Sequence, residues 1–332
     1  MDSKISDTLQ KYYDQIFQDG KLVNIHISMW GMCHSLSEED IKIDKALPEV
    51  IQLGKKMLIK PAVSNMFKSL QGKARNYLYA NSFAFPLVSQ AHFVPKGSYL
   101  KVYEALNDYR REFMALKEAF LENYESYKQE ALDYYREFAD QLNVESLAGL
   151  YPAKEAVAEK FAFEIVSFEI KLPTEFGSTD IHREVALETA AKQAEASATA
   201  SYNAEYAERL DTHMSKVNQF VNDVIGTIRS KVVEHCSLVL KKIGKNEVVT
   251  DKSISLLLGQ INDFRKMNFV GDNVIETELN KIEQLLHKGP DFSKDKDAVQ
   301  ELKTNLSGLI DEAKNITDVA SLSGQYFRKL SI

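Results

Sequence analysis

The feature that most constrains this chain is a long run of helical periodicity at residues 97–142. Its apolar residues recur at steps of three and four, close to the roughly 3.6-residue period of an α-helix, and charged residues fill the positions between them. No Pro or Gly follows Gly97 in this run, so we predict a single helix of about 70 Å. A helix of that length cannot cover its own apolar stripe. A second long helix is therefore expected to lie against it.

Residues 180–243 predict that second helix. Its first half carries a row of small side chains at steps of four, namely Ala186, Ala190, Ala194 and Ala198. Small side chains in a row allow a neighbouring helix to come close, and the large aromatic residues of the first helix fit such a groove. We therefore predict a mainly α fold. Its centre is an elongated, coiled-coil-like antiparallel hairpin of long helices, accompanied by a small β element and a C-terminal helical bundle.

Shorter patterns predict the other elements. Apolar and polar residues alternate at residues 22–30 and, with a change of phase near Val166, at residues 161–172. Two short strands need partners, so we expect them to pair in a small antiparallel sheet. Helical patterns occur at residues 2–18, 47–59, 61–78, 251–266, 274–287 and 294–315.

These elements divide the chain into four consecutive segments. Residues 1–96 hold N-terminal helices and one strand, and residues 97–243 hold the long hairpin with the strand segment 161–172. Residues 244–317 form a C-terminal three-helix segment, and residues 318–332 form a tail.

Composition excludes several classes of protein. The formal net charge of −7 argues against general nucleic-acid binding. The two cysteines, Cys33 and Cys236, do not make a disulfide framework of the secreted kind. No signal-peptide core and no apolar run long enough for a membrane span are present. We therefore expect a cytoplasmic protein without a membrane span.

Motifs for catalysis are missing from the sequence. Three Gly-Lys steps, at Gly54, Gly72 and Gly244, lack the upstream Gly and the Ser or Thr of a phosphate loop. The sequence also has no GxSxG, HExxH or CxxC pattern and no dinucleotide-binding glycine pattern. We predict that the chain is not an enzyme, has no catalytic residues and takes no cofactor.

The residues that could ligate a soft metal give no zinc motif. They are His26, Cys33, His34 and His92, and their spacing matches no established zinc pattern. We therefore predict no metal site.

Aromatic residues outside regular helix are the candidates for partner binding, namely Trp30, Phe83, Phe85 and Phe93. An exposed Trp30 would anchor an interface, whereas a buried Trp30 would pack the strand against a helix, which is the interpretation we favour. The aromatic stripe of the long helix could in principle stack on bases, but its regularity and the acidic net charge favour a role in the core. We predict that the surface near Trp30 and the loop at residues 83–95 contributes to partner binding.

An ordered set of sequence pieces carries a family resemblance. The set comprises Leu22-Val-Asn-Ile-His-Ile-Ser-Met-Trp, Leu53-Gly-Lys-Lys-Met-Leu, Phe83-Ala-Phe-Pro, the aromatic helix, Phe161-Ala-Phe-Glu-Ile-Val-Ser-Phe-Glu-Ile-Lys-Leu-Pro and Phe264-Arg-Lys-Met-Asn-Phe. Over residues 20–315 it resembles an uncharacterised bacterial and phage domain-of-unknown-function family, number 3150. The resemblance implies partners: a cobaltochelatase-like or MoxR-type AAA+ ATPase and a protein with a von Willebrand factor A domain. It implies no catalytic residue, because none is established for the family.

The resulting hypothesis is a non-enzymatic adaptor or accessory component of such an ATPase assembly, in a phage, mobile element or conflict system of a bacterial cell. One alternative is an α-helical pore-forming, toxin-like protein, although Glu164, Glu169 and Lys171 in the strand segment argue against insertion. Another is a phage structural protein that forms homo-oligomers through the long helix. The sequence leaves the partner, the oligomeric state and the biological process open.

Overall fold

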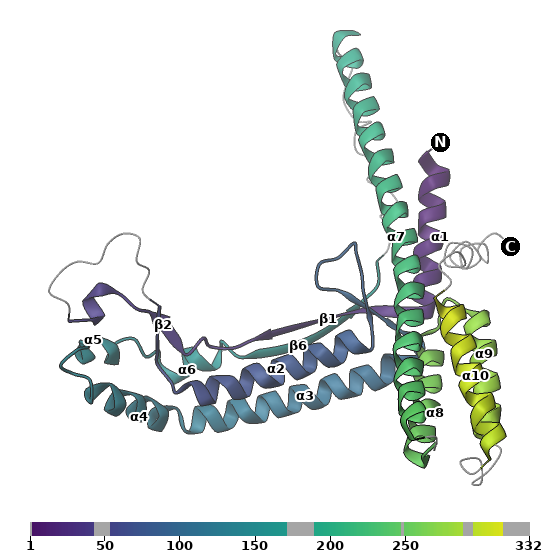
Figure 1. The fold of residues 1–332 in the computed structure, drawn as a ribbon. Coiled ribbons are helices and arrows are strands. Elements are labelled where there is room, and N and C mark those ends of the chain that lie inside the picture. Colours follow the sequence, from purple (N-terminus) through teal and green to yellow (C-terminus); the bar gives the residue numbers. More distant parts are fainter. Residues whose placement is uncertain (1, 43–53, 171–188, 247–248, 288–294, 315–332) are drawn as a thin grey trace. The chain divides into compact units, whose positions relative to one another are not determined.

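The computed structural model describes residues 2–42, 54–170, 189–246, 249–287 and 295–314. Within these ranges the protein is mainly helical, with ten α-helices and two small sheets (Figure 1). The chain separates into two compact units. Unit 1 comprises Met1–Leu22, Ser82–Leu100 and Phe168–Ile332, and unit 2 comprises Val23–Asn81 and Lys101–Ser167. Each unit is thus assembled from separated stretches, whereas the prediction above divides the chain into consecutive segments.

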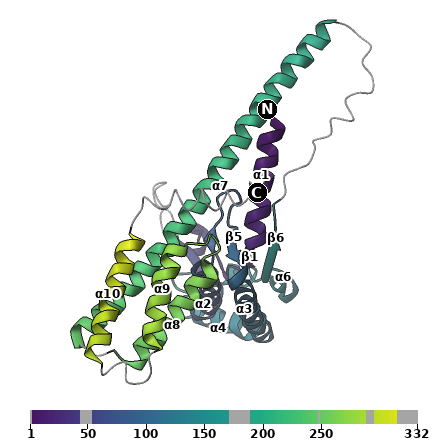
Figure 2. The same ribbon diagram turned by 90° about the vertical axis from the view of Figure 1, so that its right-hand side faces the viewer.

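Unit 1 is built around α7 (Thr189–Asn246), a helix of 58 residues. The helices α1 (Asp2–Asp19), α8 (Asp251–Met267) and α10 (Lys296–Ala313) contact it, and α9 (Asn273–Leu286) packs on α8 and α10. In Figures 1 and 2 the last three helices gather around the C-terminal half of α7, and the N-terminal part of α7 extends beyond α1. Apolar side chains of all five helices form one continuous core.

A short hairpin completes unit 1. The strands β4 (Phe83–Ala84) and β5 (His92–Pro95) pair antiparallel, with Phe83 opposite Phe93. Gly20 faces this hairpin, where a Cβ atom would lie only 2.4 Å from the Phe93 ring and 2.5 Å from the Val94 carbonyl oxygen. Only glycine fits there, because real Cβ atoms do not approach other atoms so closely.

Unit 2 has an aromatic core between α2 (Pro61–Ala80) and α3 (Lys96–Glu122), which begins in the Ser82–Leu100 segment. Pro61 starts α2, a position where its missing N–H is not needed. The Phe67 ring of α2 lies 5.5 Å from Phe113 and 6.0 Å from Phe120 of α3, and 5.0 Å from Phe161. Because these rings are buried, the predicted core role is confirmed for the middle of the aromatic stripe, whereas Tyr103, Tyr134 and Phe138 nearer its ends are exposed.

The strands and short helices of unit 2 are as follows: β2 (Cys33–Ser35), η1 (Glu38–Asp40), β3 (Lys55–Met57), α4 (Tyr124–Arg136), α5 (Val144–Ala148), α6 (Lys154–Ala158) and β6 (Ala162–Phe168). The strand β1 (Gly20–Ser28) starts in unit 1 and continues into unit 2. One sheet has the order β4-β5-β1-β6, and the other pairs β2 with β3 antiparallel.

Most predicted elements are confirmed. The helices α1, α2, α8, α9 and α10 and the strand β1 lie within about two residues of their predicted bounds. The neighbouring strands β1 and β6 confirm the predicted small sheet. Residues 171–172 of the second predicted strand and residues 180–188 of the second long helix lie outside the described residues.

Two predictions are wrong. The first long helix is divided into α3 and α4 at Asn123, whose backbone angles (φ −97°, ψ 9°) depart from helical values, and α4 ends at Arg136. The second error concerns the helix predicted at residues 47–59. Its last part is the strand β3, which pairs with β2, and residues 47–53 lie outside the described residues.

The predicted hairpin of two long helices is not confirmed. In unit 2 the stripe of α3 packs on α2 and Phe161, whereas α7 belongs to unit 1. Large rings on α2 cover the stripe without any need for a row of alanines. That row, at residues 186–198, lies outside the residues whose side chains are described.

Candidate functional site

An open groove of about 560 Å³ beside α2 and α3 is one candidate interaction surface of unit 2. Successive turns of α2 supply most of its lining, and α3 supplies the rest: Ala62, Asn65, Met66, Ser69, Leu70, Lys73, Glu112 and Leu116. Met66 is 53% exposed, although it neighbours the fully buried Phe67. A single exposed apolar side chain is ordinary on a protein surface, so Met66 makes this surface a candidate only together with the groove that it lines.

The chemistry of this groove suits binding. Its apolar members are Met66, Leu70 and Leu116, and its charged members are one base, Lys73, and one acid, Glu112. An adaptable Met with charges of both signs around it can accept apolar side chains of a partner. Sequence reasoning missed the groove. The sequence signal that could have indicated it is Met66, an apolar residue of α2 that lies outside the buried stripe of Phe67 and Leu70.

A buried ion pair organises another part of unit 2. Lys56 donates to Asp40 at 2.5 Å, and the side chains of both residues are only 6% exposed. The backbone N–H and hydroxyl of Ser37 each donate to Asp40 at 2.7 Å. Burial alone would raise the pKa of Asp40, but the hydrogen bonds from Lys56 and Ser37 lower it to about 2. This pair lies within the packed unit and has a structural role.

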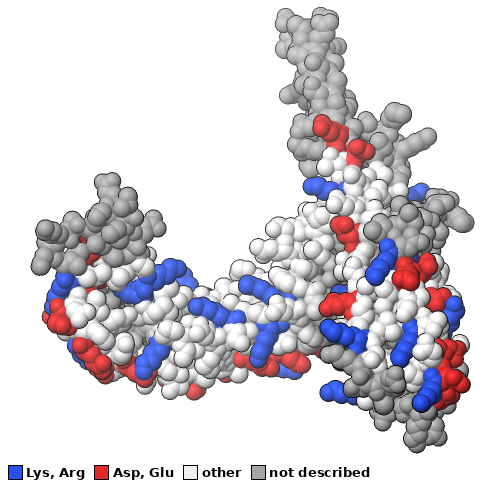
Figure 3. Space-filling model, in the orientation of Figure 1, with Lys and Arg blue, Asp and Glu red and all other residues white. Residues whose placement is uncertain are grey.

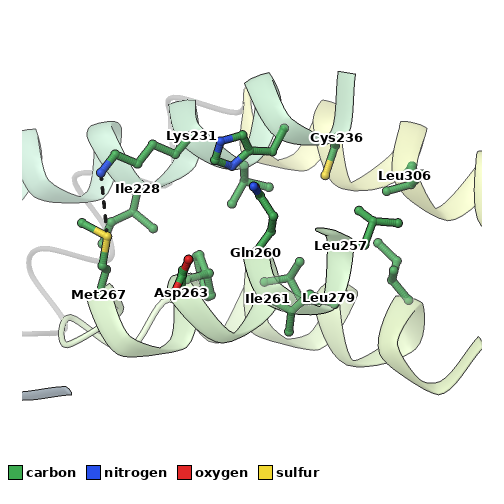
Figure 4. A pocket seen from close by; sticks show the side chains of 14 residues that line it. Ile228, Lys231, Cys236, Leu257, Gln260, Ile261, Asp263, Met267, Leu279 and Leu306 are labelled. Atoms are coloured by element: carbon green, nitrogen blue, oxygen red, sulfur yellow. Dashed lines mark hydrogen bonds between the residues drawn. The ribbon is translucent and has the colours of Figure 1, made fainter. Parts of the chain in front are cut away.

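Unit 1 contains a cavity of about 70 Å³ that is lined mainly by α7 and α8, with further side chains from α9 and α10 (Figure 4). Aliphatic side chains form most of its wall, among them Ile228, Leu257, Ile261, Leu279 and Leu306. The figure shows that they point into the space between the helices.

Four polar side chains also line this cavity. They are Lys231 and His235 of α7 and Gln260 and Asp263 of α8. Burial lowers the pKa of Lys231, and the nearby charge of Asp263 opposes this shift. Lys231 reaches the Met267 sulfur at 3.8 Å, as Figure 4 shows. The lining of the cavity therefore combines aliphatic side chains with four polar ones.

Cys236 lies among the apolar lining of the same cavity. Burial raises the pKa of its thiol to about 12. The thiol is therefore protonated at neutral pH, and it packs as a small apolar group.

Trp30 packs against helices, as the favoured interpretation expects, but it is not fully buried. It is half-buried in unit 2, and its ring lies 6.3 Å from Phe120 and 5.8 Å from Tyr124. Its neighbours on α3 and α4 thus form part of the aromatic core.

The other candidate partner-binding residues lie in unit 1 and are buried. Phe83 and Phe93 contact the Phe269 ring at 6.2 and 4.9 Å, and Phe85 contacts Phe220 at 5.1 Å. The structure therefore does not bring Trp30 together with these three rings in one unit. Their contribution to partner binding stays a prediction, and burial gives all three rings a packing role.

The candidate soft ligands do not gather in one place. His26, Cys33 and His34 belong to unit 2, whereas His92 belongs to unit 1 and shares a 3.1 Å hydrogen bond with Ser82. Within the described residues there is no group of three or more His, Cys, Asp or Glu side chains that could hold a metal ion. The same part of the chain contains no helix long and apolar enough to cross a membrane.

Charge is mixed on the surface. On the face drawn in Figure 3, both basic and acidic side chains occur on the described parts of each unit, with uncharged surface between them.

Comparisons with known proteins give one match. Neither the curated proteins nor the solved structures contain a significant match to the chain. The sequence profile of one family, described as "Protein of unknown function (DUF3150)", matches residues 18–255. Because that match covers well over half of the 332 residues, the chain belongs to the DUF3150 family of proteins of unknown function.

Proposed function

We propose that this protein is a non-enzymatic, cytoplasmic adaptor or accessory component of an assembly containing an AAA+ ATPase and a von Willebrand factor A domain protein. The proposed setting is a phage, a mobile element or a conflict system. The observation that carries the proposal is the open groove on α2 and α3, with the half-exposed Met66 beside it. The identity of the partners rests on the family resemblance alone.

The groove favours a protein partner for two physical reasons. An apolar side chain on a water-exposed helix face gains free energy when a partner covers it. The flanking Lys73 and Glu112 supply both signs of charge, which favours one orientation of the partner over others.

Affinity purification of the tagged full chain from its native host, followed by mass spectrometry, tests the proposal. Recovery of both partners, strengthened by nucleotide, is expected. Met66→Glu should reduce this recovery, because it places a charge in the apolar part of the groove. Tyr79→Glu is the matched control, since Tyr79 is 51% exposed on the same helix but does not line the groove.

Two outcomes would count against the proposal. One is a chain that purifies without either partner. The other is a chain whose light scattering shows large homo-oligomers that Met66→Glu disperses, because the groove would then serve self-assembly.

A further inference from the structure

One face of α7 carries exposed and half-buried side chains beside the cavity of unit 1. Lys231, His235, Leu238 and Lys242 follow one another at steps of four, three and four, so they share a face of the helix. Leu238 is 48% exposed, a large value for a leucine on a helix that supplies so much of the core.

The facing side of α8 repeats the pattern. Lys252, Leu256, Gln260 and Asp263 follow one another at steps of four, four and three, and Leu256 is 41% exposed. Met267 continues the row and contacts Lys231 of α7.

The two rows run in opposite directions along one groove. Lys231 pairs with Met267 at one end, and both His235 and Gln260 line the cavity. Continuing by one turn along each helix reaches the two exposed leucines, 238 and 256. The cavity and the two leucines therefore lie along one strip between α7 and α8, which we name the α7–α8 face.

An unmet hydrogen bond marks the cavity. The Oε1 atom of Gln260 is buried and accepts no hydrogen bond from any described residue. Buried acceptors normally have donors, so this atom is suited to a donor from outside. The terminal torsion of a glutamine is soft, so the carboxamide can turn toward such a donor.

The size of the cavity limits what can enter. An apolar cavity of about 150 Å³ is known to hold benzene. A cavity of about 70 Å³ is roughly half as large, which suits one branched aliphatic side chain.

The charges near the leucines define the partner further. Lys242 and Lys252 are exposed and lie one turn beyond the leucines on their helices. Of the acids near this face, Asp263 pairs with Lys266 at 3.7 Å, and Glu234 lies one turn before Leu238, on the side away from Lys242. The leucine end of the face is therefore basic, and it complements acidic side chains.

We propose that the α7–α8 face binds an acidic amphipathic helix of a partner protein. One aliphatic side chain of that helix enters the cavity, and a neighbouring side chain donates a hydrogen bond to Gln260. A second apolar side chain covers Leu238 and Leu256, and acidic residues face Lys242 and Lys252. A helix laid into a groove between two helices is a common mode of recognition. This inference rests on the proposed function, to which it adds a partner chemistry.

Binding of a synthetic peptide to the full chain tests the face. The probe is a labelled, glutamate-rich helical peptide with leucines at helical spacing and one glutamine, measured by fluorescence anisotropy. Replacement of its leucines by alanine, or of its glutamates by lysine, should weaken binding by about tenfold or more. Leu238→Glu and Leu256→Glu in the chain should do the same. Val274→Glu is the control, because Val274 is 39% exposed on α9 and does not line the cavity.

Three results would overturn the inference. The folded wild-type chain could fail to bind the probe. Alternatively, a chain that carries both Leu238→Glu and Leu256→Glu could bind the probe as well as the wild-type chain does. Alternatively, light scattering could show a dimer that Leu238→Glu converts to a monomer, which would assign the face to a second copy of the chain. Failure of the proposed function is separate, since it is read from the loss of the ATPase and its companion in purification of the wild-type chain.

Discussion

The substitution Lys56→Met tests the buried ion pair of unit 2. Methionine keeps most of the volume of the lysine stem but removes the charge that pairs with Asp40. The carboxylate then stays in a site where only 5% of its residue is exposed, with its hydrogen bonds from Ser37 still in place. Removing one partner of a buried pair typically costs about 3–5 kcal/mol. Because the donors of Ser37 remain, we expect the lower end, about 3 kcal/mol.

The pH dependence gives a second estimate, for the interactions of Asp40 with Lys56 and Ser37 together. The pKa of Asp40 is lowered from 3.8 to about 2, so the folded state favours the charged carboxylate. The stability from this shift is fully present above pH 3.8 and is lost as the pH falls toward 2. It amounts to about 2 kcal/mol, because each tenfold change in an equilibrium constant is worth about 1.4 kcal/mol. In Lys56→Met this acid-dependent loss should be much smaller.

Urea unfolding followed by tryptophan fluorescence is the assay. Trp30 is the single tryptophan and packs in unit 2, so its emission reports the unfolding of that unit. Lys60→Met is the control, since Lys60 and Glu130 form an ion pair whose side chains are 50% and 51% exposed. It should change the stability by less than about 0.5 kcal/mol. A Lys56→Met loss as small as the control's, with the acid dependence intact, would refute the reasoning.

Three further substitutions test a backbone effect, a steric contact and a second buried ion pair. Gly72→Ala should stabilise unit 2 by about 0.5–1 kcal/mol in the same assay, because nothing lies within 4 Å of the added methyl group in α2. Gly20→Ala should instead destabilise unit 1 by about 1–3 kcal/mol in thermal unfolding followed by circular dichroism, since its Cβ would collide with Phe93; an unchanged midpoint would contradict this. Arg229→Met should cost about 3–5 kcal/mol in that measurement, because it leaves the buried Asp272 without its 2.7 Å partner; a loss below about 1 kcal/mol would show that the site readily admits water.

Local sequence signals predicted the elements whose cause is local. The helical patterns at residues 274–287 and 294–315 agree with α9 and α10 to within about two residues, and the side chains of Asp272 and Asp295 cap these two helices. Ser37 likewise starts η1, where its backbone N–H donates to the Asp40 carboxylate. In each case the residues that start the element also make its hydrogen bonds.

Features that depend on tertiary packing could not be predicted from local sequence signals. The periodicity of residues 97–142 requires an apolar partner but does not say which one, and α2 and α7 both have suitable stripes. Ring contacts of Phe67 place α2 in that role. The break at Asn123 is a local departure of the backbone from helical angles, with φ −97° and ψ 9°, which the periodicity of apolar residues does not register.

The candidate sites followed the same rule. Aromatic density outside helices indicated Phe83, Phe85 and Phe93, yet such density is as typical of a core edge as of an interface, and the structure buries all three. The α7–α8 face gave no composition signal, because Leu238 and Leu256 look like ordinary helix residues until their exposure is known.

The two surfaces can be tested independently because they belong to different units. Met66 and the groove of α2 and α3 lie in unit 2, whereas Leu238 and the cavity lie in unit 1. Each side chain is about half exposed, so replacing it with glutamate should cost little folding free energy. An adaptor with two separate contacts should lose a different interaction with each substitution, and most of its apparent affinity when the contacts engage one assembly together. If the protein has only one contact with the assembly, only one of the two substitutions should weaken binding.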